Sequence, residues 1–219
     1  MIKTPELEVI CNQLRGMELE DGELIDLYKC NNASLKEGVT YSFYSYRQML
    51  SEIHTYGCLR KLSKKFDFLK MKPLSKIKDR ETKNYTFETC LHGNVEFTHK
   101  NTGISAGEFD NISKVNDYLT VFETTFRGWN KNKKNQPLRD ALSPSCFYKR
   151  VQPIFEVLDK DVGYVMIVNK DTFESKNNEP VVRNFMKSNG IIIPFYTSKE
   201  DFEKRVKSLI KEYKLCLKN

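Results

Sequence analysis

The twenty residues GEFDNISKVNDYLTVFETTF, numbered 107–126, decide the fold that the sequence predicts. Two strand-like runs flank the short polar step Asn116-Asp117. This pattern indicates a β-hairpin with a two-residue loop, because asparagine tolerates the positive φ that such a loop needs. The loop also sets the register, in which Ile112 faces Val121.

Two acidic residues fall opposite each other in this register. Asp110 faces Glu123 and Glu108 faces Thr125, and all four point to one side of the sheet because alternate residues share a face. Opposite Cβ atoms lie about 4.5–5.5 Å apart, and like charges at that distance destabilise a sheet. A divalent cation bound between the two carboxylates would remove this repulsion.

The acidic pair therefore predicts a Mg²⁺ or Mn²⁺ site. Mg²⁺ binds a few carboxylates together with waters and phosphate oxygens, a combination that suits phosphodiester hydrolysis. Two other interpretations stay open. The acidic side of the sheet is simply solvated, or a one-residue slip of the register sends Glu123 to the opposite face.

The rest of the chain predicts an α/β domain whose mixed sheet is flanked by helices. Helices are expected at residues 5–29, 41–65, 143–158 and 180–187 and from Ser198 onward. Strands are expected at residues 94–99, 109–113, 118–126, 162–169 and 191–196. The basic stretch 66–83 reads as a surface loop or short helix. We expect residues 1–40 to be a helical extension packed on the core, and residues 41–219 to form the α/β domain.

Positive charge is concentrated in one segment. The chain carries a net charge of +7, and residues 47–83 alone contain 11 Lys and Arg against 4 Asp and Glu. A localised excess of this kind indicates a polyanionic partner, nucleic acid rather than a membrane. The alternative is an ordinary solvated surface.

Nothing in the sequence indicates a membrane or secreted protein. No apolar run approaches the roughly 20 residues of a membrane span, and the N-terminus lacks a signal-peptide pattern. The six cysteines and three histidines have no metal-ligand spacing, which favours free thiols and structural or exposed histidines. We expect a cytoplasmic protein. A chain rich in lysine and asparagine with scattered cysteines also suits a viral accessory gene, acting in the cytoplasm of its host.

The order of the motifs resembles the PD-(D/E)XK nuclease superfamily, which has the restriction-endonuclease-like fold. After a helix, GEFD falls on a second strand and FETT on a third, and residues 41–169 follow the αβββαβ order of that family. The resemblance is to Holliday-junction resolvases and archaeal viral nucleases in particular. It implies that Asp110 and Glu123 are metal ligands and that Thr124 offers its backbone carbonyl to the metal.

The other catalytic positions are less regular. Many members of the family carry a glutamate on the first helix, for which Glu52 is the candidate, Glu88 a rival and Glu108 a further assistant. Thr125 stands where the family has a lysine that orients the attacking water and stabilises negative charge, which a hydroxyl cannot do. Arg127 is the nearest basic residue in the sequence that shares its face by parity.

A set of basic side chains is expected to hold the DNA backbone. Its members are Arg60, Lys61, Lys64, Lys65, Arg127, Lys131, Lys133, Lys134, Lys149 and Arg150. By analogy with enzymes that cut two strands, we also expect a homodimer.

The leading prediction is a metal-dependent DNA endonuclease. Branched or structured DNA is the expected substrate, because the chain is small and shows no separate recognition domain. Two rival interpretations remain. One is a nucleic-acid-binding protein of the same fold that lost catalysis together with the lysine. The other is a structural or interaction protein whose acidic pair is solvated.

Overall fold

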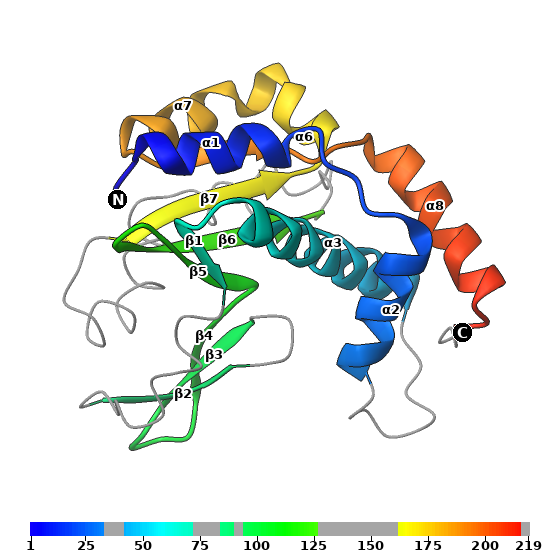
Figure 1. The fold of residues 1–219 in the computed structure, drawn as a ribbon, viewed down its shortest axis with the longest axis horizontal. Helices are drawn as coiled ribbons and strands as arrows, with labels where there is room; N and C mark the ends of the chain where they lie inside the picture. Colours follow the sequence, from blue (N-terminus) through cyan, green and yellow to red (C-terminus); the bar gives the residue numbers. More distant parts are fainter. Residues whose placement is uncertain (33–41, 72–83, 90–93, 127–161, 216–219) are drawn as a thin grey trace.

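The larger of two sheets forms the centre of the fold (Figure 1). The computed structural model describes residues 1–32, 42–71, 84–89, 94–126 and 162–215. The larger sheet has five strands in the order β1-β5-β6-β7-β8. Their bounds are Leu69–Met71, Asn111–Val115, Tyr118–Thr125, Val162–Val168 and Ile191–Pro194.

This sheet is mixed, as the sequence predicts. Strand β5 pairs antiparallel with β1 and with β6, whereas β7 lies parallel to β6 and β8 lies parallel to β7. All seven residues of β7 are buried, which fits the nearly continuous apolar run in its sequence. The α/β class is therefore confirmed.

The hairpin that decided the prediction is present in the expected register. Ile112 pairs with Val121 and Asn111 with Phe122. Asn116 has a φ of 51°, the left-handed conformation that the tight loop requires. The alternative of a one-residue slip in the register is thereby excluded.

A second, smaller sheet was not predicted as a separate unit. Strands β2 (Tyr85–Thr89), β3 (Val95–His99) and β4 (Ser105–Phe109) form an antiparallel sheet in that order. In Figure 1 it lies below the larger sheet, apart from the helices. The predicted strand over residues 94–99 belongs here and not to the larger sheet.

Two details of the predicted strands are wrong as a consequence. The predicted strand 109–113 is broken at Asp110, because Phe109 ends β4 in the smaller sheet and Asn111 begins β5 in the larger one. The first strand of the larger sheet is Leu69–Met71, inside the stretch expected to be a loop or short helix. It pairs with the hairpin through Leu69 and Val115, a long-range contact that local periodicity does not reveal.

Four helices contribute to the core on one face of the larger sheet. They are α1 (Pro5–Leu14), α2 (Asp21–Asn32), α3 (Phe43–Lys65) and α8 (Lys199–Glu212). Figure 1 shows α2, α3 and α8 close together beside the sheet. Helix α3 continues through Gly57, where the missing side chain makes room for Leu19 and Leu27 to approach.

The other face is covered by α7 (Glu179–Lys187) and the smaller sheet, whose Phe97 and Phe109 share a core cluster with Phe185 and with β7. The short helices α6 (Lys170–Glu174) and η2 (Lys176–Asn178) precede α7. Helix α8 begins as predicted, with the Ser198 hydroxyl accepting a hydrogen bond from the backbone N–H of Asp201. The helix predicted at 143–158 lies outside the described residues.

Three glutamates form a row across the smaller sheet. Glu88 lies opposite Glu96, which in turn lies opposite Glu108, and all three side chains are exposed. Asn94 donates a hydrogen bond to Glu108 over 3.4 Å. Like charges that are directly opposite on adjacent strands destabilise a sheet.

Replacing the central glutamate should therefore stabilise the protein. We expect Glu96→Thr to raise the free energy of unfolding by about 0.2–1 kcal/mol, because it removes both repulsive pairs. Urea unfolding at low ionic strength measures this change, and the gain should shrink in 1 M NaCl as the charges are screened. Glu96→Lys provides the companion variant. A loss of stability in both variants would contradict the assigned register.

Candidate functional site

The C-terminal end of β6 is the place where the predicted site residues meet. The pairing of β5 with β6 ends at Asn111 and Phe122, whereas β6 continues to Thr125 beside β7. Over these last residues, none of the strands that the structure describes pairs with the side of β6 that faced β5. Backbone groups in such a position must find other partners, and here side chains supply them.

Asp110 is the first of these partners. Its Oδ2 accepts a hydrogen bond from the backbone N–H of Thr124 over 2.6 Å. Asp110 lies in the bend between β4 and β5 and is half-buried, while the neighbouring Glu123 is 7% exposed. The structure thus brings the two predicted acidic residues to the same end of β6, next to Met166 of β7.

Gln48 of α3 is the second partner, and its amide pairs with β6 as another strand would. Its Oε1 accepts from the backbone N–H of Phe126 over 3.0 Å, and its Nε2 donates to the carbonyl of Thr124 over 2.7 Å. The same Nε2 donates to Glu52 Oε1 over 2.6 Å. Through Gln48, the half-buried Glu52 is linked to the strand that carries Glu123.

Arg47 is the third partner, one residue earlier in α3. It is 6% exposed, and its Nη2 donates to the carbonyl of Phe126 over 3.0 Å. Its Nη1 forms an ion pair with Glu203 of α8. Neither Arg47 nor Gln48 was predicted as a site residue from the sequence. Polar residues in a predicted helix look solvated, and nothing in the local sequence shows that a strand end lies beside them.

The remaining predicted positions behave differently. The carbonyl of Thr124, expected at a metal, accepts from Gln48, and the Thr124 hydroxyl donates to Thr55 Oγ1 over 2.9 Å. Thr125 is half-buried at the end of β6. Neither predicted cross-strand pair is present in the larger sheet. Asp110 lies in the bend before β5, beyond the last pair of Asn111 and Phe122, and so is not paired opposite Glu123. Glu108 belongs to the smaller sheet, as does Glu88, and so is not opposite Thr125.

The predicted basic residues on α3 do not lie at this site. Arg60, Lys61, Lys64 and Lys65 are exposed at the C-terminal end of the helix, where Lys61 pairs with Glu23 over 2.6 Å and Lys65 donates to Gln13 over 3.3 Å. At 1.5 Å per residue, Lys64 is about 18 Å along the axis from Glu52.

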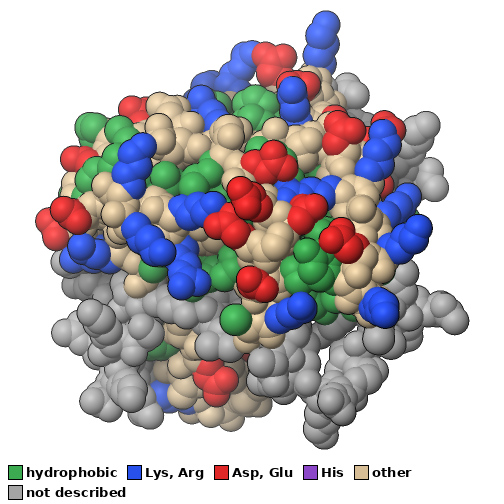
Figure 2. Space-filling view, turned by 45° about the vertical axis from the view of Figure 1, so that its right-hand side comes forward, with side chains coloured by type: hydrophobic (Ala, Val, Ile, Leu, Met, Phe, Trp, Pro, Cys, Tyr) green, Lys and Arg blue, Asp and Glu red, His purple; other side chains and the backbone are tan. Residues whose placement is uncertain are grey.

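The structure does not describe the other residues of the predicted basic set. Arg127, Lys131, Lys133, Lys134, Lys149 and Arg150 lie outside the described residues. Figure 2 shows Lys and Arg interspersed with Asp and Glu over the face it views.

The donor chemistry of the acidic pair fits Mg²⁺ or Mn²⁺. Asp110 and Glu123 offer hard oxygen atoms, and Mg²⁺ needs only one or two carboxylates when waters and phosphate oxygens complete its shell. Within the part of the chain that the structure describes, no group of three or more His, Cys, Asp or Glu side chains is placed to hold a metal ion.

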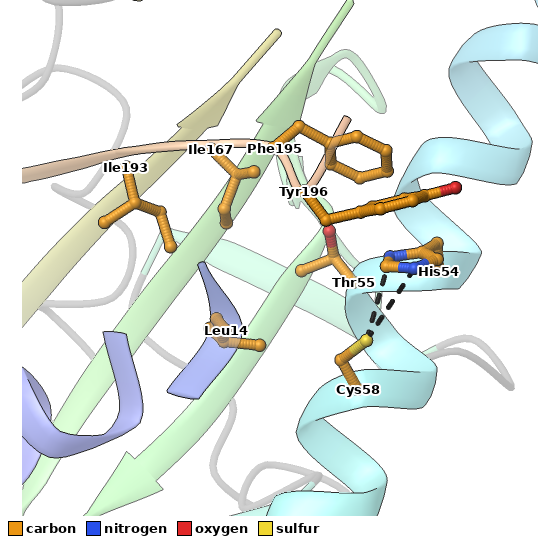
Figure 3. A pocket seen from close by; sticks show the side chains of 8 residues that line it. All are labelled: Leu14, His54, Thr55, Cys58, Ile167, Ile193, Phe195 and Tyr196. Carbon is orange, nitrogen blue, oxygen red and sulfur yellow. Dashed lines mark hydrogen bonds between the residues drawn. The ribbon is translucent and has the colours of Figure 1, made fainter. Parts of the chain in front are cut away.

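A small pocket beneath α3 contains a histidine and a cysteine (Figure 3). His54 stacks on Tyr196 with ring centroids 4.5 Å apart, and its Nε2 accepts from the backbone N–H of Leu19 over 3.2 Å. The ring proton therefore lies on Nδ1, which is 3.7 Å from Cys58 Sγ.

The His54 and Cys58 pair is not a nucleophile with its base. Burial lowers the pKa of His54 to about 3 and raises the pKa of the Cys58 thiol to about 12. A reactive cysteine needs the thiolate, so both groups remain neutral near pH 7. The pair instead connects α3 to the segment between α1 and α2. His54 accepts a hydrogen bond from Leu19 of that segment, and Cys58 contacts the carbonyl of Met17 over 3.8 Å.

Burial of neutral His54 makes stability depend on pH. The unfolded chain binds a proton near pH 6.5 and the folded protein only near pH 3, so acid favours unfolding. Between these values we expect His54 to lower the free energy of unfolding by about 1.4 kcal/mol per pH unit. Urea unfolding from pH 7 to pH 4 tests this. His54→Gln should flatten the slope and His99→Gln should keep it, whereas equal slopes in all three proteins would refute the assignment.

The Gln48 bridge should contribute measurably to stability. We expect Gln48→Ala to lower the free energy of unfolding by about 1–3 kcal/mol, because it leaves the backbone groups of Thr124 and Phe126 without this partner. Gln13→Ala is the matched control, since Gln13 is exposed and its removal should change stability by about 0.5 kcal/mol at most. Equal effects of the two changes in urea unfolding would contradict the role of Gln48.

Comparison with known proteins adds little to this picture. No protein-family model matches the chain, and no curated protein matches it. Among solved structures, the chain is similar to the protein VC1899 from Vibrio cholerae, at 15% identity and a TM-score of 0.36 over 98% of this chain. It spans 52% of that protein, about half its length, and a similarity at this level says nothing about activity. No helix in the described part of the chain is long and apolar enough to cross a membrane.

Proposed function

We propose that this protein is a metal-dependent nuclease that hydrolyses phosphodiester bonds at the C-terminal end of β6. The observation that carries the proposal is the contact between the Asp110 carboxylate and the backbone of Thr124, the residue next to Glu123. It fixes the Asp110 carboxylate at the main chain of the residue that follows Glu123. Glu52 reaches the same strand end through Gln48.

The arrangement of the larger sheet also supports the proposal. Helix α3 leads into β1, and β1, β5 and β6 form an antiparallel set that β7 joins parallel to β6. This is compatible with the αβββαβ order implied by the resemblance to the PD-(D/E)XK nucleases, with the smaller sheet inserted between the first and second strands. Asp110 directly precedes the second of these strands and Glu123 lies in the third.

Each residue would have a distinct task. Asp110 and Glu123 would hold Mg²⁺ or Mn²⁺, which supplies charge neutralisation at the phosphate and a more acidic bound water. The N–H of Thr124 orients Asp110, and Gln48 orients Glu52. DNA is the proposed substrate, and a symmetric dimer is proposed for cutting two strands.

A second candidate rests on Thr125. A neutral hydroxyl at the position of the family lysine cannot stabilise negative charge on the phosphate. A protein that binds nucleic acid without cutting it is therefore the alternative function.

Cleavage assays with matched variants separate the two functions. Supercoiled, linear and four-way-junction DNA would be incubated with Mg²⁺, Mn²⁺ or chelator. We expect metal-dependent cutting by the wild type and a loss of about 100-fold or more in Asp110→Asn and in Glu123→Gln. Asp117→Asn is the control, because Asp117 occupies the hairpin loop with an 88% exposed side chain.

Binding of Mn²⁺, followed by titration calorimetry, provides a readout that does not depend on catalysis. We expect it to weaken in Asp110→Asn and Glu123→Gln and to persist in Asp117→Asn. Cutting or metal binding that survives in both site variants would refute the proposed nuclease. Binding of DNA without cutting under every metal condition would favour the alternative.

A further inference from the structure

Tyr44 is an exposed aromatic residue close to the proposed nuclease site. It lies in the first turn of α3 and is 68% exposed. Large apolar side chains are normally turned inward at the start of a core helix, as the neighbouring Phe43 is here. The exposed ring of Tyr44 can therefore be contacted by a binding partner.

The position of Tyr44 follows from the spacing along α3. Tyr44, Gln48 and Glu52 are four residues apart, so they share one side of the helix. Gln48 is bonded to Thr124 and Phe126 at the end of β6, and Asp110 is bonded to Thr124. Tyr44 therefore lies one helical turn, about 6 Å along the axis, beyond the residue that joins α3 to the site.

The Tyr44 ring is also held in place. The guanidinium of Arg47 lies over it, 5.3 Å from the ring centroid, and the Phe43 ring meets it edge-on at 5.9 Å. Arg47 is itself fixed by Glu203 and by the carbonyl of Phe126. A cation over the face of an aromatic ring is attracted to the ring. Because the Arg47 guanidinium is hydrogen-bonded to the end of β6, this attraction holds the Tyr44 ring near that end.

We propose that Tyr44 is a stacking platform for an unpaired base of the nucleic acid that occupies the acidic site. The inference rests on the proposed function and adds its substrate class, a single-stranded or locally unpaired segment. An aromatic ring stacks with every base because each base has a π-face, so this contact selects unpaired strands and not a sequence. Bases in an intact duplex are already stacked on their neighbours and cannot use it.

The test measures binding without cleavage. Fluorescein-labelled 12-nucleotide single strands of DNA and of RNA, and the corresponding DNA duplex, would be titrated with full-length protein in chelator and followed by anisotropy. We expect Tyr44→Ala to weaken single-strand binding by about 5- to 150-fold and to leave duplex binding unchanged. Tyr44→Trp should retain single-strand affinity, because it keeps an aromatic surface. The DNA and RNA arms identify which strand is preferred.

Ile104→Ala is the matched control, since Ile104 is 64% exposed in the turn before β4 and its loss should leave affinity as in the wild type. Urea unfolding of Tyr44→Ala, which removes a mostly exposed side chain, checks that the variant is folded. Equal single-strand affinity of Tyr44→Ala and wild type would overturn the inference, and so would an equal loss for duplex and single strand. A wild type that binds no single strand would overturn it too.

The outcomes separate this inference from the proposed function. If Tyr44 governs single-strand binding but no metal supports cutting, the platform stands and the nuclease fails. If Asp110→Asn abolishes cutting while Tyr44→Ala binds and cuts as the wild type does, the nuclease stands and the platform fails.

Discussion

Strand β6 is longer than the partner that pairs with it from β5, and the backbone beyond Phe122 must still form hydrogen bonds. Asp110, Gln48 and Arg47 meet this requirement with their side chains. A buried peptide group without a partner lowers the free energy of unfolding by about as much as a lost hydrogen bond. The contacts of these three side chains with the end of β6 avoid this loss. The same requirement holds the Asp110 carboxylate at the end of the strand that carries Glu123.

The attachment of α3 follows from the same contacts. Gln48 and Arg47 tie the start of the helix to the end of β6, and Arg47 also reaches α8 through Glu203. The opposite end of α3 leads into β1, beside the hairpin. Helix α3 thus carries Tyr44 and Glu52 on the part that adjoins the end of β6. Its exposed lysines lie at the opposite end of the helix, so the proposed site and the basic surface of α3 are spatially separate.

Much of the fold could be predicted from short-range patterns. The hairpin register, the buried strand β7 and the start of α8 at Ser198 all depend on residues a few positions apart, and the structure has them as predicted. The sequence could not show that some strands form a separate, smaller sheet, because alternating apolar and polar residues look the same in a strand of either sheet. The metal, the nucleic-acid partner and the role of Thr125 stay predictions.

The sequence by itself determined the register of β5 with β6, from the loop as far as Asn111 opposite Phe122, since a two-residue loop leaves one register for the flanking strands. Only the tertiary structure decided that the chain bends at Asp110 and that a distant helix completes the edge of β6 through Gln48. The physical reason is range. Loop geometry acts between neighbours, whereas the backbone groups at a strand end accept whichever side chain the packing of the whole domain brings to them.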